Sequence, residues 1–340
     1  MTTETQQKPQ KAQKKKSSPL VTAICILVIV CNLVYIFFSQ QIHDFVGGRF
    51  YQPTSEMESI IENAGFTWRS DYIMRSTKPE LEQADIFNDH CVDDEDVNSA
   101  LGCYSSADNR IYIYDVKGKE LDGVKEAVLM HEVLHAIYDR LSDGRKEALN
   151  LDLKNYYENH KDVFGDYMDA YSEEQYYTEL HSIIGQRVYD NDLSDSLKNH
   201  YAKYFKNHDA TVEFYKKYTA VLNAEEEKIE KAKEALDAMH GILENKRNTY
   251  RSNLDSYNKQ VDYHNRQTEL GNWSQSRYDY LISQGKRIDE ERDALNAYID
   301  EYNVEVEKYN ALLEEERQLF GKLDSRFETT TEKTESDNKT

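Results

Sequence analysis

The hydrophobic pattern divides the chain into three stretches that differ in the number and spacing of their apolar residues. Residues 20–38 form a nineteen-residue apolar run, interrupted only by Thr22 and Asn32. Residues 54–206 mix short alternating segments with helical ones, whereas residues 208–325 carry sparse apolar positions on a charged background. An apolar run of this length can cross a bilayer as a helix. The pattern therefore predicts a transmembrane helix at 20–38, a linker at 39–53, a folded domain at 54–206 and a long helical segment at 208–325.

The helical segment repeats its apolar residues every seven positions, which is typical of a coiled coil. A polar break at residues 271–274 separates two arms, so the simplest arrangement is an antiparallel hairpin; an intermolecular parallel coil is the alternative. The repeating positions are Leu222, Ile229, Leu236, Leu243, Tyr250 and Tyr257 in the first arm, then Ile288, Leu295, Tyr302 and Tyr309, with Ile299, Val306, Leu313 and Phe320 as a second row. Residues 326–340 have nothing to bury and are predicted to be disordered.

The domain at 54–206 is predicted to combine helices with a small antiparallel sheet. Residues 55–63 have a helical pattern, and residues 66–68 and 72–74 have a strand-like one. Residues 101–104 and 110–116 predict a hairpin, because alternating apolar segments flank a turn-forming stretch at 105–109.

One helical stretch carries His131-Glu132-Val133-Leu134-His135. Histidines four residues apart share a face of a helix, so both imidazoles can reach one metal ion, and the adjacent Glu can take a proton from water there. Uncharged, mostly branched residues surround the motif, as a buried metal helix requires. Asp122 is the predicted N-cap, and Asp143-Gly144 the predicted end. The alternative is a core helix with two hydrogen-bonded histidines.

A second helix, opened by a capping-box pattern at Ser172 and Gln175, offers the third metal ligand. Glu179 lies mid-helix on or beside the apolar stripe, where a buried carboxylate needs a compensating partner. An ion pair is the alternative explanation. His181 is the other candidate for the third ligand. It lies about 200° around the helix from Glu179, so the two residues cannot bind one ion.

These residues resemble the zincin superfamily of zinc metallopeptidases, and the glutamate on a later helix resembles its gluzincin branch. The resemblance implies an α+β zincin-like catalytic domain with Zn²⁺ held by His131, His135 and Glu179, and Glu132 as general base. It also implies an oxyanion donor, for which Tyr176, His181 and His200 are candidates, as are Tyr177 and Tyr201. By analogy, the strand at 110–116 would border the cleft and pair with an extended substrate. Ile183 stands where several gluzincins have an acid, so no second-shell carboxylate is assigned.

The charge of the chain bears on its partners and its topology. A formal net charge of -21 argues against a nucleic-acid partner. Lysines precede the apolar run, which predicts that residues 1–19 form a cytoplasmic basic arm and that the chain after about residue 39 lies outside, as at a bacterial cell surface. No small-x-small cleavage site follows the run, so an uncleaved anchor is favoured over a signal peptide.

Two of the four cysteines, Cys25 and Cys31, lie within the apolar run. Cys91 and Cys103 flank the acidic loop 92–96 in the exported part, where an oxidising compartment favours a disulfide. A metal role beside His90 is the alternative.

Two functions are consistent with this sequence. The first is a membrane-anchored, extracytoplasmic zinc endopeptidase acting on a protein or peptide substrate, with the coiled coil as a surface for a protein partner. The second is a membrane-anchored coiled-coil adaptor whose globular domain holds a non-catalytic zinc ion.

Overall fold

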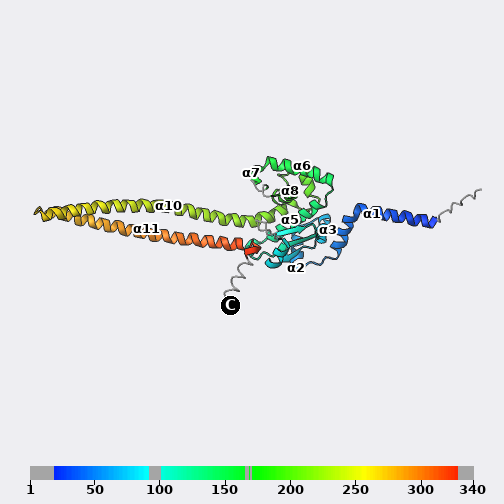
Figure 1. The fold of residues 1–340 in the computed structure, drawn as a ribbon, viewed down its shortest axis with the longest axis horizontal. Coiled ribbons are helices and arrows are strands. Elements are labelled where there is room, and N and C mark those ends of the chain that lie inside the picture. Colours follow the sequence, from blue (N-terminus) through cyan, green and yellow to red (C-terminus); the bar gives the residue numbers. More distant parts are fainter. Residues whose placement is uncertain (1–18, 92–100, 165–167, 169–170, 328–340) are drawn as a thin grey trace, which may run out of the picture.

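The computed structural model describes residues 19–91, 101–164, 168 and 171–327. The expectations for the basic arm, for the acidic loop 92–96 and for most of the tail lie outside these residues. The described chain is mostly helical and elongated (Figure 1). Helix α1 (Pro19–Arg49) projects from one end of a central body, and the long helices α10 (His208–Glu269) and α11 (Gln275–Gly321) project from the other.

The sheet of the central body has three strands in the order β1-β3-β2. β2 (Gly102–Ser105) pairs antiparallel with β3 (Arg110–Tyr114), which confirms the predicted hairpin. β1 (Glu80–Glu82) pairs with β3 in parallel, so the sheet is mixed rather than purely antiparallel. β3 therefore lies in the centre, and the expectation that residues 110–116 form a free edge is wrong. The outer edge on the β2 side belongs to residues 102–105.

Helices take up most of the body. α2 (Ser55–Ala64) agrees with the predicted helix at 55–63. The strands expected at 66–68 and 72–74 are wrong: Thr67 caps α3 (Trp68–Ser76), accepting a hydrogen bond from the Ser70 amide, and only Phe66 makes a bridge, to Phe205. Three-residue patterns are too short to separate strand from helical periodicity. The remaining helices are α4 (Ala84–Cys91), α6 (Asp143–Asn159), α7 (Lys161–Phe164), α8 (Glu173–Arg187) and α9 (Asp195–Tyr201).

The motif-bearing helix α5 (Val124–Asp139) is the most buried helix of the body. Its N-cap is Gly123 rather than Asp122, whose carboxylate instead pairs with Lys217 at 2.6 Å. The predicted end at Asp143-Gly144 is also wrong, because Ser142 caps a new helix there and Asp143 favours the first turn of α6. α5 packs against the sheet on one side and against α8 on the other.

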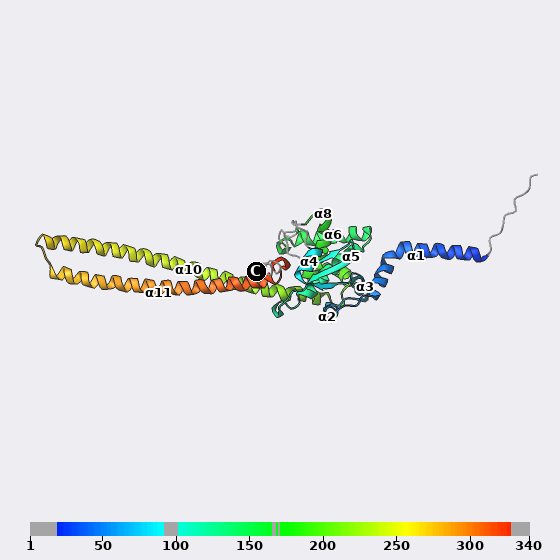
Figure 2. The ribbon, with the colours of Figure 1, turned by 60° about the horizontal axis from the view of Figure 1, so that its bottom comes forward.

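Helices α10 and α11 run antiparallel and lie side by side in both views (Figures 1 and 2). Asn253 of α10 donates to the Glu291 carboxylate of α11 at 2.9 Å, and Tyr298 contacts the Met239 carbonyl oxygen. The two helices join at a turn containing Gly271, whose φ is 82°. The hairpin expected from the heptad repeat therefore forms within one chain.

The apolar run lies in α1, which also packs against α3. Among the described residues, no single straight helix is both long and apolar enough to cross a membrane; residues 23–36 and 38–49, which meet at a bend of 77°, satisfy the requirement only together. The end of α1 is tied to the body by Asp44, whose carboxylate binds the Arg140 guanidinium at 2.8 Å. Because Arg140 is the C-cap of α5, this buried ion pair joins α1 to the motif-bearing helix.

Candidate metal centre

Helix α5 presents His131 and His135 on one face, one turn apart. Their Nε2 atoms lie 3.0 Å from each other, and the two rings meet edge to face. The imidazoles retain 20% and 12% of their side-chain exposure, while the residues around them on α5 are almost wholly buried. The helix therefore holds both ring nitrogens at the margin of the core, where they face one point that solvent can reach.

Glu179 completes this group from α8. Its Oε1 lies 3.4 Å from Nε2 of His135, and its Oε2 lies 3.6 Å from Nε2 of His131. The capping box of Ser172 and Gln175 fixes the start of α8, as the sequence predicts. His131, His135 and Glu179 together can hold a metal ion, because one ligand atom of each lies close to those of the other two.

The three ligands can be compared with the geometry of a tetrahedral site. Two ligand atoms bound to zinc at about 2.05 Å lie about 3.3 Å apart. The observed separations of 3.0, 3.4 and 3.6 Å bracket this value. Two imidazoles and one carboxylate are also a known donor set for Zn²⁺. The residues present therefore fit the ion.

Thr178 is a contact that the sequence analysis missed. Its Oγ1 lies 2.8 Å from Nδ1 of His135. If Nδ1 carries the proton and donates it to this hydroxyl, Nε2 keeps its lone pair for a metal. The available signal was a hydroxyl residue directly before the predicted ligand, but Ser and Thr are too common for that signal to be specific.

Glu132 lies beside the three ligands and is 5% exposed. The pKa of its carboxyl is raised to about 7, because burial and the charge of Glu179 raise it by more than His131 and the Tyr104 main chain lower it. On its other side is Gly102 of β2: a Cβ there would lie 3.1 Å from Oε1 of Glu132. The carboxyl is thus confined between the ligands and the outer edge of the sheet.

The two histidines differ in their electrostatics. Burial lowers the pKa of His135 to about 4, so its imidazole is neutral at pH 7. Burial also lowers the pKa of His131, but the hydrogen bond and charge of Glu179 outweigh it and leave that pKa above its ordinary value. The same contact holds the pKa of Glu179 below its usual range despite burial. Without metal, Glu179 and His131 therefore behave as an ion pair.

Three of the candidate oxyanion donors, His181, His200 and Tyr201, contact one another. His181 is fully buried, and its Nε2 lies 2.9 Å from Nε2 of His200. The Tyr201 hydroxyl donates to the main-chain oxygen of His181, and the Tyr176 ring packs edge to face against Tyr177. His181 and His200 thus belong to a histidine and tyrosine cluster on the inner side of α8, and neither is part of the group formed by His131, His135 and Glu179.

A second group of potential metal ligands consists of Asp190, His208 and Asp209. His208 is already engaged on both nitrogens, with Asp190 through Nδ1 at 2.8 Å and with the Gly185 carbonyl through Nε2 at 2.7 Å. Asp209 accepts from the Asp190 amide. These bonds fasten the start of α10 to the end of α8, which is a sufficient structural role.

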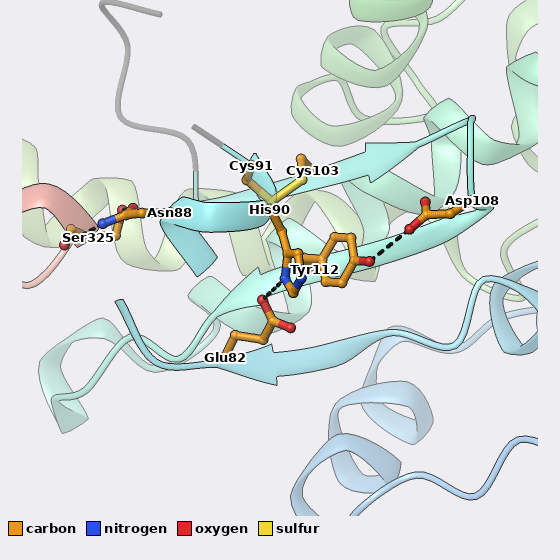
Figure 3. The surroundings of a disulfide bond; sticks show 8 residues. All are labelled: Glu82, Asn88, His90, Cys91, Cys103, Asp108, Tyr112 and Ser325. Carbon is orange, nitrogen blue, oxygen red and sulfur yellow. Dashed lines mark hydrogen bonds and ion pairs between the residues drawn. A yellow bond between two sulfur atoms is a disulfide. The ribbon is translucent and has the colours of Figure 1, made fainter. Parts of the chain in front are cut away.

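The disulfide predicted between Cys91 and Cys103 is present (Figure 3). It joins the end of α4 to β2, next to Gly102. His90 does not take the alternative metal role: its Nδ1 lies 2.9 Å from the Glu82 carboxylate, and its ring stacks on Tyr112. The disulfide therefore ties the edge strand beside Glu132 to the rest of the domain.

In comparisons with known proteins, no family model, no curated protein and no solved structure matches this chain. Function therefore has to be inferred from the chemistry of the site itself.

Proposed function

We propose that this chain is a zinc-dependent peptidase that hydrolyses peptide bonds outside the cell. The observation that carries the proposal is the convergence of His131, His135 and Glu179 with a buried glutamate, Glu132, beside them. A structural site would more often close its coordination with four protein ligands, whereas three ligands leave a position for water or substrate.

The residues of the site would have separate roles in metal binding, proton transfer and orientation of a ligand. His131, His135 and Glu179 would hold the ion, which when bound polarises a carbonyl group and makes a nearby water more acidic. Glu132, with a pKa of about 7, can accept a proton from the attacking water at neutral pH and return it to the leaving nitrogen. The Thr178 hydroxyl would keep His135 in the orientation and tautomer that ligation needs.

The outer edge of β2 supports an extended peptide as substrate. Leu101 accepts from the Tyr114 amide, so the alternation of antiparallel pairing turns the main-chain groups of Gly102 and Tyr104 away from β3. The Tyr104 main chain hydrogen-bonds to the Glu132 carboxyl, and Gly102 has no side chain to block the approach. A substrate strand pairing at this edge would bring its carbonyl carbon toward the general base.

The apolar part of α1 supports a membrane anchor, with the lysine-rich first residues on the cytoplasmic side. The body would then stand outside the bilayer, because Asp44 and Arg140 fasten the end of α1 directly to it. A disulfide between Cys91 and Cys103 suits an oxidising compartment outside the cytoplasm.

The test is to purify the full chain in detergent and measure zinc content and cleavage of an unfolded protein. We expect one zinc per chain in the wild type. Glu132→Gln should keep zinc and lose at least about 100-fold in cleavage, whereas Glu179→Gln should lose zinc. The control is Glu173→Gln, in the exposed first turn of α8. A wild type without stoichiometric zinc, or a Glu132→Gln variant with full activity, would refute the proposal.

The adaptor function is the second candidate, supported by the length of the exposed α10–α11 hairpin. It predicts that Glu132→Gln leaves the biological role intact while zinc binding contributes only stability. Complementation of a deletion strain with Glu132→Gln distinguishes the two functions, since only the peptidase requires the general base.

A further inference from the structure

A hollow of about 620 Å³ lies between α10 and α11, near the turn that joins them. Its floor is Leu281, which is 6% exposed. Two cations, Lys259 from α10 and Arg277 from α11, stand in its wall, and no acidic residue lines it. This absence is informative in a chain with 63 acidic and 42 basic residues.

The surrounding segment, residues 256–287, is named the tip here. It contains five basic residues against three acidic ones, although the chain as a whole carries -21. The bases are Lys259, Arg266, Arg277, Lys286 and Arg287, and the acids are Asp262, Glu269 and Asp279. The tip is therefore a locally positive region on an acidic protein.

Ion pairing varies along the hairpin. Outside the tip some cations pair with carboxylates on their own helix, as in Lys228–Glu225, Arg247–Glu244 and Lys308–Glu305, whereas others, such as Lys233 and Arg251, pair with no carboxylate of the described residues. None of the five tip cations forms an ion pair with any carboxylate in the part of the chain that the structure describes. No carboxylate of the described residues holds these five cations in an ion pair, so they are available to an external anion.

The rest of the wall combines aromatic rings with hydrogen-bonding groups. Tyr263 and Tyr280 are 48% and 50% exposed, and the Arg277 guanidinium lies over the Tyr263 ring at 4.8 Å. Hydroxyl and amide groups come from Ser256, Gln260 and Ser276. Trp273, in the turn directly before Ser274 of the lining, is 53% exposed. Rings that can stack and small polar groups that can both donate and accept match the faces and hydroxyls of a sugar.

The tip is also the point of the molecule farthest from α1 (Figures 1 and 2). Helix α10 has 62 residues, which corresponds to a length of about 93 Å at 1.5 Å per residue. A chain anchored through α1 would therefore present the tip well away from its own bilayer, so that bilayer is not the surface that the tip meets.

We propose that the tip pocket binds a saccharide bearing carboxylate or phosphate groups. Lys259 and Arg277 would receive the anionic group, while Tyr263 and Tyr280 would stack on the sugar rings. An acidic peptide satisfies the cations but uses neither the rings nor the clustered hydroxyls. This assignment is independent of the proposed peptidase activity, because no residue of the metal centre takes part.

The experiment uses the full chain in neutral-lipid nanodiscs and three polymers with one backbone: dextran, carboxymethyl dextran and phosphorylated dextran. Trp68 and Trp273 are the only tryptophans of the chain, so Trp68→Phe makes the fluorescence of Trp273 a reporter at the tip. We expect saturable binding of at least one charged dextran and at least tenfold weaker binding of the neutral one. Whichever charged polymer binds more tightly identifies the anionic group.

Variants test the residues. Lys259→Gln with Arg277→Gln should weaken binding at least tenfold, and Tyr263→Leu with Tyr280→Leu should do the same without changing charge. The matched control is Lys233→Gln with Arg251→Gln, which removes two exposed cations from the part of α10 outside the tip. Equal loss in this control, equally tight binding of poly-glutamate, or tighter binding of phosphatidylglycerol vesicles would overturn the proposal, as would no binding of any charged dextran.

Discussion

Gly102 of β2 lies directly against Glu132 of α5. A Cβ at position 102 would be 2.4 Å from Cγ1 of Val128 and 3.1 Å from Cγ of Glu132. The edge strand and the motif-bearing helix are thus in contact through a residue that has no side chain, which leaves the Glu132 carboxyl next to the main chain of the edge strand.

Gly102→Ala should therefore disturb both stability and the site. The added methyl group has to displace Val128 and Glu132, at a cost of about 1 to 3 kcal/mol in the free energy of unfolding. Cleavage should fall while zinc remains bound, because no ligand is touched. Denaturant unfolding and zinc content measure the two effects. Gly144→Ala is the control: nothing lies within 4 Å of its Cβ, and an alanine in α6 should be neutral or slightly stabilising. Equal behaviour of the two variants would contradict the contact.

The raised pKa of Glu132 predicts a pH dependence of stability in the metal-free protein. A carboxyl with an ordinary pKa near 4.5 when unfolded and about 7 when folded stabilises the fold fully below pH 4.5, and this contribution is lost as the pH rises through 7. The loss amounts to about 3 kcal/mol. Burial lowers the pKa of His135 and His200 to about 4, and these histidines add stability as the pH rises over the same range. The contribution of Glu132 is therefore the difference between wild type and Glu132→Gln in chelator-treated protein: from pH 4.5 to pH 7.5 the variant should gain more stability, or lose less, than the wild type. Identical pH dependence in the two proteins would exclude the contribution of Glu132.

Thr178→Val replaces the hydroxyl that contacts His135 by a methyl group of similar size. We expect zinc affinity to drop about 10- to 100-fold, because the imidazole loses the partner that fixes its orientation and tautomer. Competition with a chromogenic chelator measures this change directly. Thr219→Val on α10 is the matched control, since its hydroxyl bonds only to helix carbonyls. Unchanged affinity in Thr178→Val would show that the contact does not support the metal.

Asp44→Ala removes one partner of a buried ion pair. The Arg140 and Asp44 side chains are only 7% and 9% exposed, so the guanidinium would be left without its carboxylate at a cost of about 3 to 5 kcal/mol. Glu158→Ala, which breaks the exposed pair with Lys161, should cost at most about 1 kcal/mol. Thermal unfolding of the two variants in the same detergent compares them. Similar unfolding temperatures would mean that α1 is not fastened to the body by Asp44.

Several features follow from local sequence alone. The spacing of His131 and His135 puts both on one face of any helix, and the seven-residue repeat with its polar break predicts two helical arms, with pairing within one chain as the simplest arrangement. The pairing of Cys91 with Cys103 was predicted because they are the two cysteines outside the apolar run. The three-residue patterns at 66–68 and 72–74 were wrongly predicted to form strands, because capping by Thr67 favoured a helix.

Other features depend on contacts between residues distant in sequence, which no local pattern contains. Packing of α8 on α5 decides that Glu179, and not His181, lies beside the imidazoles, and it brings Thr178 to His135. The parallel pairing of β1 with β3 decides that β2 forms the edge next to Glu132. The pocket at the tip exists only because two helices meet there. The sequence by itself thus determined the long helices, the β-hairpin and the residue types of the candidate site, whereas tertiary packing decided which side chains face one another, because a side chain's neighbours are set by the relative placement of elements.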